Sequence, residues 1–411
     1  MKPSSSPGAG ATRLASSPGA DATGLATTLA ASLTPPGRAA IATLGIRGPR
    51  AWKIVREHFR LSAASTKKLP ENPDASHIWL GRIGEKDFGT IADQVVVTLQ
   101  QTEPVPWMEI HCHGGTETVC WLLEILERQG CRVCTWQELE QATTTDPWQT
   151  AATLELVQAS TIRTAAILLD QYHGAFGRAL TEIQTALANH DLVQTSRMLE
   201  WVARYADVGR HLTTPWKVAV IGPPNVGKSS LVNALAGFQR SVVAPTPGTT
   251  RDLVTTLIAV DGWPVELIDT AGLREETGPL EGLGITLARD AAASADLCLW
   301  LLDASAPPTW PEDNFREQQK LKLVVNKTDL SPIWEIDQFP VLRVSALTGA
   351  GLAELVEAIA RWLAPHPPPP GAAVPFTPDL ASLAEEALNH ARAGRPDRTK
   401  QMLAALANDA R

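Results

Sequence analysis

The sequence Gly222-Pro-Pro-Asn-Val-Gly-Lys-Ser229 decides the fold of the central part of this chain. It fits the pattern G-x-x-x-x-G-K-[ST], and it lies between an apolar run at 217–221 and a helical pattern at 229–236. Its glycines let the backbone turn N–H groups toward phosphate, and the start of the helix adds a positive dipole end. We expect Lys228 to reach the β- and γ-phosphates and the Ser229 hydroxyl to bind magnesium. The stretch therefore predicts a phosphate-binding loop between a strand and a helix.

Two further sequences supply the remaining magnesium and phosphate contacts. Asp269 begins the sequence D-T-A-G, in which its carboxylate serves magnesium and the N–H of Gly272 meets the γ-phosphate. The sequence G-T-T-R-D begins at Gly248, and a threonine at this place joins magnesium and orders a switch loop when the γ-phosphate is present. Thr249 and Thr250 both satisfy this pattern, and we favour Thr250 although the spacing does not separate them.

The base is predicted to be guanine. Asn326 begins the sequence N-K-T-D, whose Asp329 carboxylate accepts hydrogen bonds from both guanine N1–H and the 2-amino group. Adenine lacks this pair of donors, so the pattern favours GTP over ATP. The Ala346 N–H, after the last apolar run, is expected to contact the guanine carbonyl. The residues predicted to contact the nucleotide are Asn225, Val226, Gly227, Lys228, Ser229, Ser230, Thr249, Thr250, Gly272, Asn326, Lys327, Asp329, Ser345 and Ala346.

Hydrolysis needs a polar group that orients water, and the residues alone do not identify it. Ras-like enzymes use a glutamine shortly after the D-x-x-G sequence, but here Gly272 is followed by Leu273. Glu275, Glu276 and Glu281 lie nearby, and the spacing does not choose among them. Each of these carboxylates, taken alone, is more simply a solvated loop charge.

The pattern of the chain changes along its length. Strand-like and helical runs mix as far as Val133, which indicates an α+β domain. Helical periodicity then extends over 148–211. Short apolar strands alternate with helices over 217–363, which is typical of a parallel sheet covered on both faces. A proline-rich linker at 366–375 precedes one or two amphipathic helices over 378–411.

Composition narrows the class of protein. The chain of 411 residues has a formal net charge of −8, which gives no general attraction to nucleic acid. Its five cysteines are too scattered for a disulfide framework. No run approaches the ~18 apolar residues of a membrane span, and residues 1–24 lack the apolar core of a signal peptide. We therefore expect a disordered N-terminal tail, no membrane contact and a cytoplasmic location.

The motifs resemble those of the MnmE (TrmE) family of tRNA-modifying GTPases. The resemblance extends over most of residues 28–390, and its N-terminal part separates this family from related GTPases that share the switch sequence. The segments that carry it are 34–41, 109–115, 224–237, 248–252, 269–275 and 280–285.

This resemblance implies a fold and an activity. The fold is an α/β P-loop GTPase domain inserted in an all-α helical domain and preceded by an α+β domain of the type that binds a folate derivative and dimerises. The activity is hydrolysis of GTP to GDP, stimulated by potassium. Asn225 is then the potassium ligand, and Glu281 is the catalytic glutamate that positions water beside Lys228 and Thr250. The magnesium ligands are then Ser229, Thr250 and Asp269.

The resemblance also implies partners and domain boundaries. The partners are tRNA, a flavin-dependent enzyme that helps to modify the wobble uridine, and a second copy of the chain. The predicted domains are a tail at 1–24, the α+β domain at 25–134, the first helical part at 135–213, the GTPase domain at 214–365, and a linker with the second helical part at 366–411.

Departures from the family pattern favour a second hypothesis. The family ends in C-x-G-K, whereas no cysteine follows Cys298 here, and residues 103–107 replace the family's Y-T-G-E-D loop. A regulatory or scaffold GTPase that has lost the tRNA role would show these differences. A third hypothesis, a ribosome-assembly GTPase, requires an RNA-binding domain after Pro365, where few residues remain.

A zinc site is a further alternative in the N-terminal part. His111, Cys112 and His113 precede the pair Cys131 and Cys134 at a spacing that suggests a metal. Both histidines, however, lie on a strand-like run before a Gly-Gly break, and the family resemblance already accounts for this segment. We therefore do not expect zinc.

Overall fold

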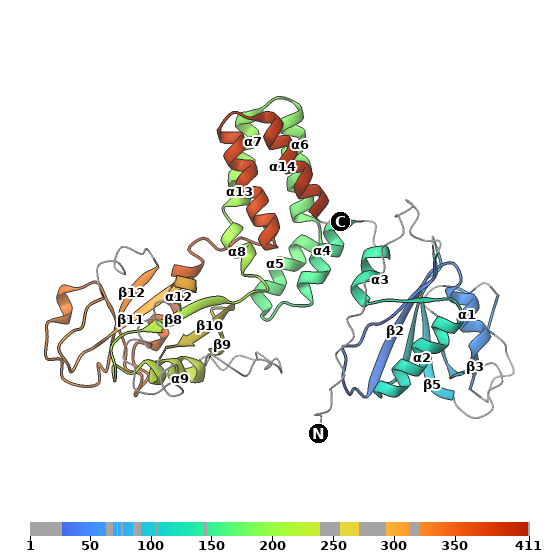
Figure 1. Ribbon diagram of the computed structural model, residues 1–411, viewed down its shortest axis with the longest axis horizontal. Helices are drawn as coiled ribbons and strands as arrows, with labels where there is room; N and C mark the ends of the chain where they lie inside the picture. Colours follow the sequence, from blue (N-terminus) through green and yellow to red (C-terminus); the bar gives the residue numbers. More distant parts are fainter. Residues whose placement is uncertain are drawn as a thin grey trace, which may run out of the picture. The chain divides into compact units, whose positions relative to one another are not determined.

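The structure is a computed structural model, and its two parts are described separately. It describes residues 27–62, 69–71, 73–74, 77–84, 92–103, 105–143, 146–238, 255–270, 293–311 and 320–409. Contacts divide the chain into two compact units, 1–145 and 146–411. Each unit contains a sheet of its own (Figure 1).

The first unit contains a seven-stranded sheet with the order β3-β4-β5-β6-β2-β1-β7. Its strands are β1 (Leu29–Ser32), β2 (Ile41–Arg47), β3 (Phe59–Leu61), β4 (Ile78–Gly84), β5 (Ala92–Gln101), β6 (Trp107–His113) and β7 (Arg132–Val133). Neighbouring strands are antiparallel, except for the parallel pair of β1 and β7. A largely antiparallel sheet can bury one face and leave the other polar.

Helices α1 (Ala51–His58) and α2 (Thr116–Arg128) pack on the apolar face of this sheet; in Figure 1, α2 crosses that face. Side chains alternate along β6, so Met108, Ile110 and Cys112 all point to this core, and each is at most 2% exposed. The first unit is therefore an α+β structure, in agreement with the prediction.

A third helix, α3 (Trp136–Thr143), moves the predicted end of this part of the chain. Its Leu139 is buried with Leu29 and Ala31 of β1. The sequence pattern predicts that the α+β domain ends at residue 134, whereas α3 belongs to the first unit, which extends to residue 145. Helical periodicity shows that a segment is helical but not which core it joins, which explains the difference.

The second unit contains a six-stranded sheet with the order β13-β12-β11-β8-β10-β9. Its strands are β8 (Trp216–Ile221), β9 (Thr255–Val260), β10 (Trp263–Asp269), β11 (Leu297–Asp303), β12 (Leu321–Asn326) and β13 (Leu342–Arg343). The prediction of a parallel sheet is wrong at one edge, because β9 is antiparallel to β10. Asp261 and Gly262 join these strands with φ of 49° and 78°, as a two-residue hairpin turn requires.

Helices α9 (Lys228–Phe238) and α12 (Leu352–Leu363) pack against each other and against the sheet. Their side chains Leu231 and Ile359 are completely buried in the main core of the unit. On the opposite face of β8, Ile221 is buried in a separate cluster. Both faces of the sheet are therefore covered, as the apolar strands predict.

Among the described residues of the second unit, seven helices lie outside the sheet region. They are α4 (Pro147–Leu156), α5 (Ile162–Tyr172), α6 (Ala175–Ala188), α7 (Leu192–Ala203), α8 (Ala206–Arg210), α13 (Pro378–Arg392) and α14 (Pro396–Asp409). Helix α13 packs on α7 and α8, and α14 packs on α13 and α6 (Figure 1). Helices that precede the sheet in the sequence and helices that follow it thus share one core. In this core the Phe176 and Phe376 rings meet edge to face, with centroids 5.9 Å apart. Among the described residues, no helix is both long and apolar enough to cross a bilayer.

Two polar side chains of α5 hold the proline-rich linker. Gln171 is completely buried; its Nε2 donates to the carbonyl oxygen of Ala372 over 3.0 Å, and its Oε1 accepts from the N–H of Val374 over 3.2 Å. The Asp170 carboxylate accepts from the N–H of Gly371 over 2.7 Å. These bonds satisfy backbone groups of a segment that has no secondary structure of its own.

Candidate nucleotide-binding site

The predicted phosphate-binding loop joins β8 to α9. Gly222 and Gly227 have φ of 145° and 95°, which residues with a side chain rarely adopt. A Cβ atom at Gly227 would lie 2.4 Å from Nδ2 of Asn326, and one at Gly222 would lie 2.8 Å from the carbonyl oxygen of Leu301. Glycine at both positions therefore lets the loop approach β11 and β12 closely.

Lys228 begins α9 and turns its side chain back over this loop. Its Nζ donates to the carbonyl oxygens of Gly222 at 3.1 Å and Pro223 at 2.9 Å, and the residue is only 6% exposed. A buried cation and the start of a helix both favour negative charge nearby. Ser229 and Ser230, in the first turn of α9, are exposed. The loop therefore offers a cation, backbone N–H groups and hydroxyls to an anionic ligand.

Asn326 ties the loop to the Ser345–Ala346 segment. Its side chain is 2% exposed; Nδ2 donates to the carbonyl oxygen of Val226 over 2.9 Å, and Oδ1 accepts from the N–H of Ala346 over 3.0 Å. The sequence predicts that Asn326 and the Ala346 N–H serve the base, and the structure adds the hydrogen bond that joins these two groups to each other. The structure thus gives Asn326 a role in holding the site together, which spacing alone does not reveal.

Lys327 and Asp303 form a second tie to the loop, and Asp303 was not among the predicted site residues. The Lys327 Nζ donates to the carbonyl oxygen of Asn225 and to Oδ2 of Asp303, both over 2.7 Å. Burial alone would raise the pKa of Asp303, but hydrogen bonds from Lys327 and Ser305 and the Lys327 charge outweigh it, so that pKa lies below its ordinary value. Asp303 of β11 pairs in register with Asn326 of β12. This pairing brings Asp303 close to Lys327, the residue after Asn326.

Asp329 follows β12 and is the residue that the sequence predicts to select guanine. It is exposed, and its carboxylate accepts a hydrogen bond from the hydroxyl of Ser345, which is completely buried. A fixed, accessible carboxylate can accept from two adjacent ring donors. The predicted selection of guanine requires an acceptor of this kind.

Asp269 ends β10 beside the phosphate-binding loop. It pairs in register with Val220 of β8 and is 5% exposed. The hydroxyl of the following residue, Thr270, donates to the carbonyl oxygen of Val220 over 2.9 Å. Carboxylate and hydroxyl oxygens are ligands that magnesium prefers, so Asp269 and Ser229 are suited to this ion. The predicted residues Thr249, Thr250, Gly272 and Glu281 lie outside the described residues.

The histidines and the cysteine of β6 point to opposite faces of the first sheet. Alternation along β6 places His111 and His113 on one face and Cys112 on the other. His111 Nδ1 lies 3.0 Å from Oγ1 of Thr43, and His113 pairs with Asp93. Across the described part of the chain, no group of three His, Cys, Asp or Glu side chains is placed to hold a metal ion.

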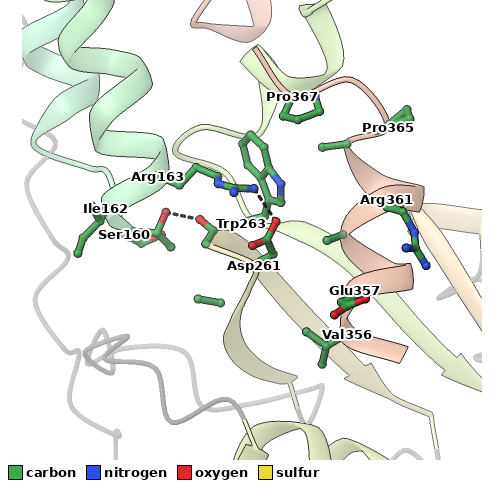
Figure 2. Close-up of a pocket in the computed structure, with 15 residues that line it drawn as sticks. Ser160, Ile162, Arg163, Asp261, Trp263, Val356, Glu357, Arg361, Pro365 and Pro367 are labelled. Atoms are coloured by element: carbon green, nitrogen blue, oxygen red, sulfur yellow. Dashed lines mark hydrogen bonds and ion pairs between the residues drawn. The ribbon is translucent and has the colours of Figure 1, made fainter. Parts of the chain in front are cut away.

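A separate cavity of about 830 Å³ shares no residue with the nucleotide motifs. It lies between the start of α5, the β9–β10 turn and the end of α12 (Figure 2). Arg163 and Trp263 border it on one side and Arg361 on the other. The Thr161 hydroxyl donates to the carbonyl oxygen of Gly262 over 2.6 Å at its edge. The cavity therefore lies where α5 and α12 meet the β9–β10 turn of the second sheet.

Comparison with known proteins agrees with this site. A family model described as "50S ribosome-binding GTPase" matches residues 217–334, and one described as "GTP-binding protein TrmE N-terminus" matches residues 28–139. The chain is 32% identical over 375 residues to the tRNA modification GTPase MnmE of Geobacillus thermodenitrificans, with 80% of each chain covered. The MnmE of Koribacter versatilis is 30% identical over 371 residues, again with 80% of each chain covered.

The chain belongs to the MnmE family. The family models match most of the first unit and most of the sheet of the second unit, and the chain contains a GTPase domain. Among solved structures, the G domain of the T. maritima FeoB iron transporter is 29% identical and covers 36% of this chain and 98% of its own, with a TM-score of 0.27. As an MnmE-family protein, the chain is expected to use guanine nucleotide and magnesium.

Proposed function

We propose that this chain hydrolyses GTP to GDP and that the hydrolysis serves modification of the wobble uridine in tRNA. The observation that carries the proposal is the double tie of the N-K-T-D segment to the phosphate-binding loop. Asn326 holds Val226, and Lys327 holds Asn225, so the base-selecting Asp329 stands on the same rigid frame as Lys228. The MnmE relatives are tRNA modification GTPases, which supports tRNA as the substrate.

Within this proposal each described residue has a distinct task. Lys228 neutralises charge on the polyphosphate. The N–H groups of the loop and of the first turn of α9 donate hydrogen bonds to the phosphate oxygens. Ser229 and Asp269 hold magnesium, which when bound neutralises charge on the β- and γ-phosphates. Asp329 accepts from the two guanine donors while Ser345 fixes its carboxylate. Outside the described residues, Thr250, which the sequence analysis favours over Thr249, joins Ser229 and Asp269 as a magnesium ligand, and the N–H of Gly272 meets the γ-phosphate.

Turnover is assigned to two further residues by family resemblance. Glu281 positions the attacking water, and Asn225 ligates a potassium ion that offsets charge developing between the phosphates. Asn225 is exposed, with φ of 61°, so its side chain projects from the loop rather than into the core. A carboxamide oxygen in that position is a suitable ligand for a hard cation.

The remaining parts of the proposal concern architecture and partners. We propose that 214–365 is a GTPase domain that interrupts one helical domain, because α13 packs on α7 and α8. The α+β unit is proposed to dimerise and to offer the folate-type site of the family. The expected partners are tRNA and a flavin-dependent enzyme.

Hydrolysis is tested by steady-state phosphate release from GTP. Replacing Glu281→Ala should leave GTP affinity unchanged and lower turnover by at least about 10²-fold, within the range for loss of a positioned proton acceptor. Exchanging potassium for sodium should slow the wild-type protein. Unchanged turnover in the variant would remove Glu281 from its assignment, and indifference to the cation would do the same for Asn225.

The tRNA role is tested separately. A strain that lacks the wobble-uridine modification is supplied with this chain, and the modified nucleosides of its tRNA are measured. Restoration of the modified uridine supports the proposal and rejects the scaffold alternative. An active GTPase that restores nothing would favour the scaffold alternative instead.

A further inference from the structure

The Asp303 carboxylate lies beside the nucleotide site but has no task in the mechanism above. It ends β11, and its side chain is 14% exposed. Oδ1 accepts from the N–H and the hydroxyl of Ser305 at 2.8 and 2.7 Å, and Oδ2 accepts from Lys327 at 2.7 Å. The Trp334 indole also donates to the Asp303 backbone carbonyl over 2.8 Å. Both carboxylate oxygens and the backbone are therefore held in one orientation.

We propose that Asp303 is a positioning residue for GTP hydrolysis, because it aims the Lys327 ammonium at the backbone carbonyl of Asn225 and so fixes the phosphate-binding loop. This inference rests on the proposed function, in which Asn225 binds the activating cation. The contacts run in one line, from Trp334 and Ser305 through Asp303 and Lys327 to Asn225.

The loop needs such a restraint because Asn225 has an uncommon backbone conformation. Its φ of 61° is left-handed, which costs a residue with a side chain on the order of 1 kcal/mol and persists only where neighbours enforce it. Lys327 also has a left-handed φ, of 63°, so its own placement needs support. A lysine held by the Asn225 carbonyl alone would be free to turn toward solvent.

Asp303 supplies this support by charge and by geometry. The Lys327 side chain is 31% exposed, so water screens the pair only in part. A carboxylate fixed on its other oxygen by Ser305 leaves Oδ2 aimed at the ammonium. Loss of the carboxylate should therefore act on the cation-binding side of the loop more than on folding or base recognition.

The test compares Asp303→Ala and Asp303→Asn with the wild-type full chain. We expect Asp303→Ala to lower kcat about tenfold, the effect of a small misplacement of reacting groups, and to raise the potassium concentration that gives half-maximal rate. Asp303→Asn, which keeps an acceptor without the charge, should lie between them. Affinity for fluorescent GDP should change less than kcat in both variants.

A substitution of another acidic residue serves as a control for the effect of removing a negative charge. Asp337 is an exposed acid in the same part of the chain and pairs with Arg343 rather than with the loop; Asp337→Asn should behave as wild type. Folded Asp303 variants with wild-type kcat and wild-type potassium response would overturn the inference. A wild-type protein that ignores potassium would refute only the Asn225 assignment, and the kcat comparison would still decide the positioning role.

Discussion

The Arg163 guanidinium lies 2.8 Å from the Asp261 carboxylate, although the two residues are 98 positions apart. Arg163 belongs to the first turn of α5, and Asp261 forms the turn between β9 and β10 (Figure 2). The same guanidinium stands 5.1 Å from the ring centroid of Trp263. One side chain thus joins the helical part of the second unit to the hairpin that leads to Asp269.

This contact predicts a measurable coupling. Arg163→Ala should lower the free energy of unfolding by about 1–2 kcal/mol, since a partly exposed ion pair contributes about 0.2–1 kcal/mol and a cation–π contact about 0.5–1 kcal/mol. Urea unfolding of Arg163→Ala, Asp261→Ala and the double variant gives the pair energy. The more exposed pair of Arg343 and Asp337 serves as control and should show almost no coupling. Strictly additive effects at Arg163 and Asp261 would contradict the prediction.

Gly227 in the phosphate-binding loop and Gly237 in α9 should respond differently to replacement by alanine. Gly227→Ala would force a side chain into a backbone with a φ of 95° and a clash with Asn326. Nucleotide affinity should therefore fall about 5- to 150-fold, which corresponds to about 1–3 kcal/mol of strain. Gly237, in the last turn of α9, has open space around a Cβ atom. Gly237→Ala should keep the affinity and add at most about 1 kcal/mol of stability. Titration with fluorescent GDP and thermal unfolding measure both; equal affinities would contradict the assigned loop geometry.

Base selection should follow the donor and acceptor pattern of Asp329. Asp329→Asn replaces an acceptor by an amide that can donate, so GDP affinity should fall on the order of 10²-fold or more. Xanthine carries a carbonyl where guanine has its 2-amino group, so XDP should bind the variant better than GDP does. Competition titrations with GDP, XDP and ADP check this. A variant that still prefers GDP would place the guanine elsewhere.

Alkaline pH should destabilise the fold through its buried thiols. Burial raises the pKa of Cys112, Cys131 and Cys298 to about 11, from an ordinary value of 9.0. The folded protein therefore holds these protons more tightly than the unfolded chain, and stability falls as pH rises through this interval. Urea midpoints between pH 8 and pH 11 should fall less steeply in Cys298→Ala than in wild type. Exposed Cys120 is the control, and Cys120→Ser should leave the slope unchanged.

Much of the nucleotide site could be predicted because its motifs are formed by residues that are adjacent in the sequence. Glycines with left-handed φ, a strand before them and a helix after them fit into one short segment from Trp216 to Phe238. The N-K-T-D segment is equally compact. The antiparallel strand β9 escaped prediction, because short apolar strands do not reveal direction without the turn geometry of Asp261 and Gly262.

Residues whose partners are distant could not be predicted. Asn326 reads in sequence as a base contact, yet it bonds to Val226, 100 positions away. Asp303 reads as an ordinary strand-end acid, and only the parallel pairing of β11 with β12 sets it opposite Asn326. Helix α3 has a helical pattern that suits either unit, and its packing on Leu29 and Ala31 decides the matter.

The sequence by itself determined which nucleotide chemistry this protein can perform, because backbone freedom, charge and hydroxyl groups are properties of a few adjacent residues. The tertiary structure alone decided how that chemistry is held in place. Lys327 reaches both Asn225, 102 positions away, and Asp303, 24 positions away. Such meetings depend on strand order and on burial of the whole core, which bring distant parts of the chain together against their conformational entropy.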